Sequence, residues 1–156
     1  MYMNKKGLQF SSRDCYSLRD VLGNINANAI RKFKEVIEHR FNEGLMCGLP
    51  NGVCEFNDDY LVKDWEAAKQ KWFDILDKII YAFEDNEPCT LDYFNFVEGP
   101  QHGTETDCNG VTLTRWNMVP DNNEGYEAFK RAEEEHGKKV KEGFELFSRY
   151  FLDLWY

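Results

Sequence analysis

Glu133 and His136 are the pair whose spacing most resembles part of a metal site. They lie three positions apart in a helical pattern, so they share one helix face, as Glu and His ligands do in di-metal helix bundles. Such a centre also needs a second Glu-x-x-His pair and two further Glu residues. His39 follows Glu35 and Glu38 but has no Glu three positions before it. We therefore interpret Glu133 and His136 as the polar end of a helix stripe and predict no metal.

The cysteines are five in number, and their spacing favours free thiols over a zinc site or disulfides. Structural zinc usually takes two closely spaced ligand pairs, and the sequence has no Cys-x-x-Cys. His102, Asp107 and Cys108 share one segment, but a thiol nucleophile needs a His within hydrogen-bond reach, which proximity in a loop does not establish. The role of His102 stays open. The cysteines are Cys15, Cys47, Cys54, Cys89 and Cys108.

Arg115 and Trp116 place a positive charge and a flat aromatic ring side by side in the sequence. With Tyr93, Phe94 and Phe96 opposite, they would form a stacking platform for a base or nucleotide. The simpler alternative is that these rings belong to an aromatic core. We predict that any contact with a ligand or partner involves the segment 93–116, because function concentrates on loops held by a rigid scaffold.

A basic helix face near the N-terminus would complete such a site. Arg31, Lys32 and Arg40 lie on the polar side of the first helical pattern, and this basic face would supply phosphate contacts. The alternative is a solvated helix face. The ligand-binding residues that the sequence predicts are Arg115, Trp116, Tyr93, Phe94, Arg31 and Arg40.

Three helical patterns, at about 17–42, 60–86 and 126–155, must position these residues. Each carries apolar residues in steps of three and four, the period of one helix face. Asp64 is the expected N-cap of the second helix. Gly23 and three nearby Asn residues weaken the first helix, so a break there is an alternative. The second and third helices are expected to pack together through large apolar residues: Trp72, Ile79, Phe83, Phe144, Phe147 and Phe151.

The segment 88–125, between the last two helices, differs from the helical segments in amino-acid composition and pattern. Residues 91–97 and 111–119 favour strands, whereas residues 98–110 are rich in Gly, Thr and Asp. We predict a small β-hairpin with a long mobile loop, inserted into a mainly α domain that spans residues 1–156. Its core is expected to resemble a three-helix bundle, and residues 1–16 to be extended or frayed.

Charge and hydropathy limit the classes of function. The chain carries a net charge of −9, divided into +2 for residues 1–57 and −11 for residues 58–156. This acidity makes nucleic acid an unexpected partner but leaves a basic protein open. There is no apolar leader and no run of 18 apolar residues, so we predict a reduced, cytosolic protein without membrane contact.

Three segments, in order, resemble a family of small uncharacterised proteins encoded by tailed bacteriophages. They are Ala29–Pro50, Trp72–Glu84 with the sequence WFDILDKIIYAFE, and Lys139–Trp155 with the sequence KVKEGFELFSRYFLDLW. The resemblance covers about half of the chain and leaves out residues 88–125. It implies a virus-encoded, mostly helical protein of the host cell cytoplasm. It implies no activity and no catalytic residues.

The expected function is therefore non-catalytic binding without a cofactor. The protein would antagonise a host protein or sequester a small anionic ligand such as a signalling nucleotide. One alternative is a metal- or thiol-dependent enzyme. Another is an acidic decoy of nucleic acid, although Lys138, Lys139 and Lys141 interrupt the acidic face that a decoy needs. Self-association into a homo-oligomer is a further alternative.

Overall fold

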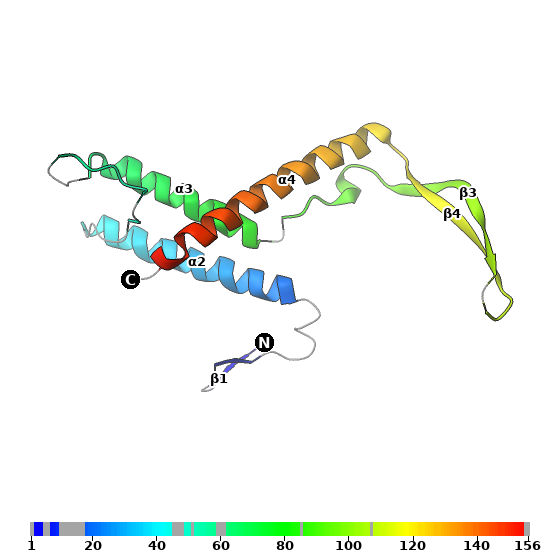
Figure 1. Ribbon diagram of the computed structural model, residues 1–156, viewed down its shortest axis with the longest axis horizontal. Helices are drawn as coiled ribbons and strands as arrows, with labels where there is room; N and C mark the ends of the chain where they lie inside the picture. Colours follow the sequence, from blue (N-terminus) through cyan, green and yellow to red (C-terminus); the bar gives the residue numbers. More distant parts are fainter. Residues whose placement is uncertain are drawn as a thin grey trace. The chain divides into compact units, whose positions relative to one another are not determined.

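The computed structural model is mainly helical, as the sequence predicts, and its described residues form two small two-stranded antiparallel sheets, one of which is the predicted hairpin (Figure 1). The chain forms two compact units: residues 1–86 with 137–156, called unit 1, and residues 87–136, called unit 2. None of the described helices is long and apolar enough to cross a membrane. The structure describes residues 2–4, 7–9, 18–44, 49–50, 52–58, 62–84, 86–106 and 108–154.

Helix α3, Trp65–Phe83, begins where its cap dictates. Asp64 has an extended backbone, and its carboxylate accepts a hydrogen bond from the backbone N–H of Ala67 at 2.9 Å. This confirms Asp64 as the N-cap, which satisfies an otherwise unpaired N–H of the first turn. The helix is shorter than the predicted 60–86, because Val62 forms a β-bridge with Phe56 and Glu84 has an extended backbone.

Helix α2, Leu18–Asn42, runs without the break that its glycine and asparagines made an alternative. Gly23 is buried, and a Cβ atom there would stand 2.6 Å from the carbonyl oxygen of Phe83. The lack of a side chain thus lets α2 approach the end of α3 closely, and this packing outweighs the poor helix propensity. Helix α4, Asn123–Tyr150, starts and ends a few residues before the predicted 126–155. The 3₁₀ turn η2, Phe151–Asp153, follows it.

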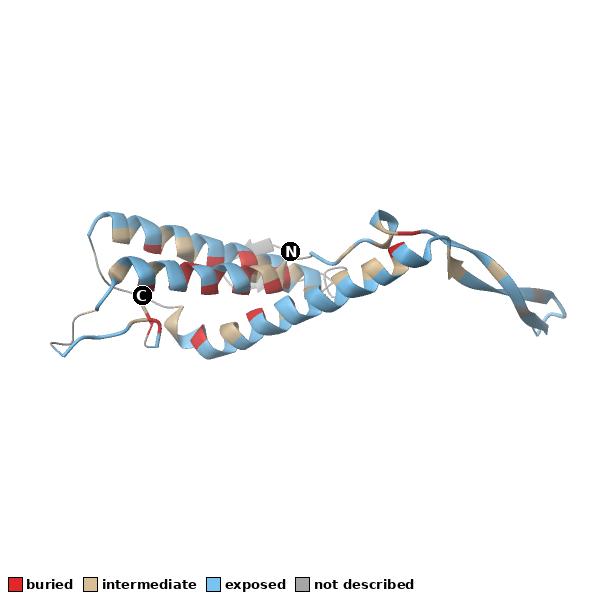
Figure 2. Ribbon diagram, turned by 90° about the horizontal axis from the view of Figure 1, so that it is seen from above, coloured by how far each residue is buried: buried red, intermediate tan, exposed pale blue. Residues whose placement is uncertain are grey.

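In unit 1, α2 and α3 pack antiparallel over a long apolar contact. Trp72 of α3 is fully buried, with the ring of Phe33 edge-on at 6.5 Å. Figure 2 shows buried residues at intervals along these two helices. Lys34 and Asp77 form an ion pair at 2.5 Å beside this contact. The buried residues of this core include Ala27, Ile30, Ile37, Trp72, Leu76 and Ile79.

The end of α4 crosses α3, as the sequence predicts. Phe83 contacts the rings of Phe144 at 5.1 Å and Phe147 at 4.9 Å, and Trp72 contacts Tyr150 at 5.4 Å. The expected core is too large, however, because Phe144 stays 44% and Phe151 48% exposed. The stronger partner of α3 is α2, a pairing that periodicity alone does not reveal. The arrangement of a three-helix bundle stays a prediction.

The N-terminal lead contains short extended pieces. Strand β1, Tyr2–Asn4, pairs antiparallel with β2, Gly7–Gln9. The remaining residues of the segment 1–16 lie outside the described residues. The frayed state predicted for them therefore stays a prediction.

Unit 2 consists of a 3₁₀ turn, a β-hairpin and the first half of α4. The turn η1 spans Thr90–Asp92, β3 spans Phe96–Thr106 and β4 spans Thr112–Pro120. The hairpin was predicted, but the long loop at 98–110 is wrong. Most of that segment is strand, paired with β4 up to Thr106↔Thr112. The sequence did not predict this part of β3 because strands were inferred from alternating apolar and polar residues. A strand that is exposed on both faces does not need that alternation.

Candidate functional site

The hairpin is anchored by an aromatic cluster at its base. Phe94 is only 4% exposed, and its ring lies edge-on to Phe96 at 5.1 Å, Tyr126 at 5.3 Å and Phe129 at 5.7 Å. Tyr93 contacts Phe129 at 5.8 Å. The two predicted binding residues Tyr93 and Phe94 therefore lie in the packing of unit 2. Phe94 presents almost no ring surface to a ligand.

Backbone contacts fix the same base. The Asn95 N–H donates to the carboxylate of Asp121 at 2.9 Å, and the Asp121 N–H donates back to the Asn95 carbonyl at 2.9 Å. A Cβ atom at Gly125 would collide with the carbonyl oxygen of Tyr93 and stand 2.7 Å from the side chain of Asn122. The first turn of α4 thus lies tightly against the segment that enters β3, and this holds the two strands to the helix.

Beyond this base, most of the hairpin residues whose burial the structure describes are exposed (Figure 2). Residues paired directly across the strands project to the same face, and alternate residues of one strand do so too. The pairs Phe96↔Pro120, Glu98↔Met118 and Gln101↔Trp116 therefore share one face. Three large apolar side chains on it are half-exposed: Phe96 at 53%, Trp116 at 48% and Met118 at 55%. We call this the apolar face of the hairpin.

Trp116 was predicted as a site residue and Phe96 as part of the stacking platform opposite it, whereas Met118 was not predicted. Met118 follows Trp116 by two positions, so the alternation from residue 111 to 119 already places the two on one side. Phe96 joins them only through the pairing of the strands. The sequence therefore contained the signal for Met118, but not for the strand register that brings Phe96 to the same face.

The predicted cationic residues belong to two different units of the chain. Residue 115 lies on β4 of unit 2, where it pairs with Gly103. Arg31 and Arg40 lie on α2 in unit 1. Arg31 forms an ion pair with Glu84 and donates a hydrogen bond to Asn28 at 2.8 Å. A ligand-binding role for these six residues stays a prediction.

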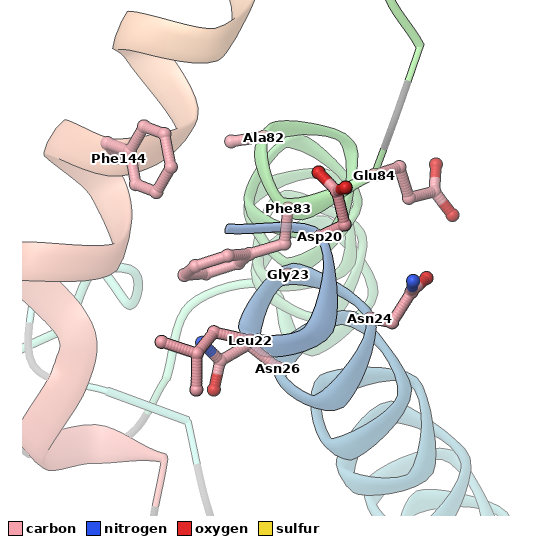
Figure 3. Close-up of a pocket in the computed structure, with 9 residues that line it drawn as sticks. All are labelled: Asp20, Leu22, Gly23, Asn24, Asn26, Ala82, Phe83, Glu84 and Phe144. Carbon is pink, nitrogen blue, oxygen red and sulfur yellow. The ribbon is translucent and has the colours of Figure 1, made fainter. Parts of the chain in front are cut away.

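A cavity of about 270 Å³ lies in unit 1 where α2 begins and α3 ends (Figure 3). Leu22, Phe83 and Phe144 form its apolar side, and Asn24 and Glu84 point away from Phe144. Glu84 already pairs with Arg31. The cavity has room for a small apolar group but no His or Cys among its described lining residues. Its further lining residues are Asp20, Gly23, Asn26 and Ala82.

The residues with potential for metal or thiol chemistry are dispersed. Glu133 is exposed on α4, and among the described residues no three His, Cys, Asp or Glu side chains form a group able to hold a metal ion. His102 belongs to β3, Cys108 is exposed in the turn after it, and residue 107 lies outside the described part.

Three of the five cysteines belong to the described part, where each is a free thiol. Cys89 and Cys108 are exposed and Cys54 is half-buried. Burial raises the pKa of the Cys54 thiol, because desolvation penalises the thiolate, and the positive charge of Lys71 opposes this shift. Cys54 is thus less activated for nucleophilic chemistry, not more. Cys15 and Cys47 lie outside the described residues.

The two units differ strongly in charge. Unit 2 holds three Lys and Arg residues against eleven Asp and Glu residues, a net charge of −8, so the rest of the chain carries only −1. One of the three cations, Lys130, lies 4.2 Å from the Tyr126 ring centre and donates a hydrogen bond to Glu127, which raises the Lys130 pKa. The acidity noted in the sequence therefore belongs to the unit that carries the exposed hairpin.

Comparison of the chain with protein-family models, with curated proteins and with solved structures finds no match. The candidate site consequently rests on the geometry, exposure and charge of unit 2.

Proposed function

We propose that the protein acts by non-catalytic binding to a partner protein, and that the hairpin of unit 2 carries the contact. The observation behind the proposal is the apolar face, where Phe96, Trp116 and Met118 are each about half-exposed. Trp, Phe and Met are enriched in protein interfaces, and an exposed apolar cluster with a polar rim is typical of a binding site.

The energetics of the hairpin support the same proposal. A two-stranded sheet without a covering layer is marginally stable in water. The aromatic cluster around Phe94 compensates for this at the base, but nothing in unit 2 covers the described side chains farther out. A partner that covers Trp116 and Met118 would remove apolar surface from water and stabilise the hairpin at once.

Charge favours a protein over a nucleotide or nucleic acid. A net charge of −8 on unit 2 repels phosphate and attracts a basic protein surface. The earlier expectation of a small anionic ligand therefore becomes the second candidate. Its support is confined to Trp116, whose exposed ring is suited to stacking.

The partner that we propose is a host protein, met in the cytoplasm of an infected cell and antagonised by being covered. This part of the proposal rests on the resemblance of the segments Trp72–Glu84 and Lys139–Trp155 to small phage proteins. It requires no catalytic group.

The test replaces Trp116 and Met118 together by Ser. Leu91→Ser is the matched control, because Leu91 is 73% exposed in the same unit but lies outside the hairpin. Affinity capture from the host, with quantitative mass spectrometry, is expected to recover the same partner with the wild type and the control and to lose it with the double variant. Far-UV circular dichroism and thermal melting verify folding.

Two results would contradict the proposal. One is recovery of the same partner by the folded double variant. The other is a rise in melting temperature on adding a nucleotide that is abolished by Trp116→Ser, which would support the second candidate instead.

A further inference from the structure

The two strands of the hairpin differ in how well their outer edges are protected. Because the sheet has only two strands, each strand has one edge without a partner strand in the described part of the chain. Natural edge strands are usually blunted by proline, bulges or charges, since an open edge can pair with another chain.

The edge of β3 is blunted. Its pairing shifts register between Glu98 and Gln101 and again between Gln101 and Gly103, so two irregularities interrupt it. Pro100 lies in the first and has no N–H to donate. Gly99 is required there, because a Cβ atom would stand 2.8 Å from the Asn117 carbonyl oxygen. Glu98 and Glu105 add charge to the same strand. An incoming strand finds no continuous ladder on β3.

The edge of β4 is regular. Thr112–Pro120 contains no glycine, its only proline is the last residue, and Arg115 is its only charged residue. Thr, Val and Trp favour extended backbone. Alternate residues of such a strand direct N–H and C=O groups away from β3. The strand therefore offers an open row of hydrogen-bonding groups beside Trp116 and Met118.

We infer that the outer edge of β4 accepts an extended segment of a basic protein as a third strand. The inference rests on the proposed function and specifies its partner. Main-chain hydrogen bonds to β4 would hold the segment, as in other cases of strand addition. Apolar residues at every second position would continue the apolar face beside Trp116 and Met118. Lys or Arg residues flanking the strand would meet the net charge of −8 on unit 2.

A second copy of the chain is the competing occupant of the same edge. Pairing β4 with β4 would bring two units of charge −8 together, and this repulsion disfavours self-association. A basic segment has the opposite charge and the same capacity for backbone pairing. The charge of unit 2 therefore selects the basic partner over the second copy.

The experiment uses the full chain and three capped peptides. The probe is KKVTVTVTVKK. The first control is KKVPVPVPVKK, which keeps the charge but loses alternate N–H donors, and the second is EEVTVTVTVEE. Fluorescence anisotropy is expected to show the probe binding at least about tenfold more tightly than either control, with weaker binding at high salt. Hydrogen exchange by NMR is expected to show new protection at alternate amides of β4 and none on the outer edge of β3.

A charge series on the strand sharpens the test. Thr114 is exposed on the same side as Trp116, so its substitution leaves the anchor cluster intact. Thr114→Glu is expected to strengthen binding of the probe and Thr114→Lys to weaken it, each by about threefold or more. The proline peptide, whose charge is the same, reports how much of the effect is electrostatic attraction alone.

The inference is overturned if the proline peptide binds as well as the probe, if new protection appears on β3 and not β4, or if sedimentation shows a dimer whose β4 amides are protected without peptide. These outcomes differ from failure of the proposed function. If the Trp116 and Met118 variant loses the captured host protein while that protein leaves the β4 amides unprotected, the function stands and the strand addition falls. If the variant keeps the host protein, the proposed function falls first.

Discussion

The carbonyl oxygen of Lys78 on α3 occupies the position beside Gly143 on α4 where a side chain would project. A Cβ atom at residue 143 would collide with this oxygen and stand 2.5 Å from the Cβ atom of Ala82. Lys78 also pairs with Glu142 at 2.7 Å, so the two helices touch both through backbone and through charge. The exposed ion pair contributes little. The glycine is what permits the close crossing.

Gly143→Ala is therefore expected to destabilise the protein by about 1–3 kcal/mol, the usual cost of overpacking a close contact. The matched control is Gly137→Ala on the same helix, where a Cβ atom meets nothing within 4 Å. Alanine is the better helix former, so the control is expected to stabilise by about 0.5–1 kcal/mol. Urea unfolding followed by circular dichroism measures both. Equal effects of the two substitutions would contradict the crossing.

Trp72→Ala is expected to cost about 3–5 kcal/mol, because Trp72 is fully buried between Phe33 and Tyr150. Phe147→Ala is expected to cost less, about 1–2 kcal/mol, since Phe147 is only partly buried although it contacts Phe83. The two variants are compared by chemical unfolding. If Phe147→Ala lowers the free energy of unfolding more than Trp72→Ala does, Trp72 is not at the centre of the core.

Cys54 is expected to react with iodoacetamide at higher pH in the folded protein than in the denatured protein. Burial raises its pKa in the folded state, and this cause disappears on unfolding. The sign for stability follows: the folded state holds the proton more tightly, so the contribution of this thiol is lost as pH rises through the folded pKa. Peptide mass spectrometry across a pH series gives the pH midpoint of Cys54 alkylation. This midpoint distinguishes thiolate formation from slow access of the reagent to the thiol.

Lys71→Ala extends this prediction. The charge of Lys71 lowers the Cys54 pKa, so its removal is expected to move the Cys54 midpoint to still higher pH. The denatured variant serves as its own reference. A midpoint that falls in the folded variant would show that Lys71 affects Cys54 by another route.

The helices followed from the sequence because each one carries its own periodic signal. Asp64 identified the start of α3 through its capping chemistry, which is local and needs no knowledge of the fold. The partner of each helix did not follow, because an apolar stripe does not specify what covers it. The close approaches at Gly23 and Gly143, which align α2 and α4 with α3, depend on residues distant in sequence.

In the hairpin, unlike in the helices, the local sequence was a poor guide to the secondary structure. Glycine, threonine and aspartate in residues 98–110 predicted a loop, yet residues 98–106 belong to a strand that accommodates Gly99 and Pro100 in an irregular step. The sequence singled out the aromatic segment as the candidate site, but composition could not tell that Phe94 would be buried and Trp116 half-exposed. That division is made by the anchor on α4, which is formed by Tyr126 and Phe129.

Phe94→Ala is expected to release the hairpin from this anchor while leaving the core of unit 1 intact. Phe94 is almost fully buried, and its ring contacts, with Phe96, Tyr126 and Phe129, all lie within unit 2. Removing the ring would cost about 3–5 kcal/mol at a fully buried site, more than a two-stranded sheet supplies by itself. Leu91→Ala is the control, since Leu91 is 73% exposed in the same unit.

Native-state hydrogen exchange reads both units of this variant in one experiment. The amides of β3 and β4 are expected to lose protection in Phe94→Ala and to keep it in Leu91→Ala. The amides of α3 around Leu76 are expected to stay protected in both, because Leu76 is buried in unit 1, whereas the ring contacts of Phe94 lie within unit 2. If the hairpin keeps its protection without Phe94, the aromatic cluster is not its anchor. If α3 loses protection in parallel, the two units unfold together and the hairpin cannot be treated as a separately held binding element.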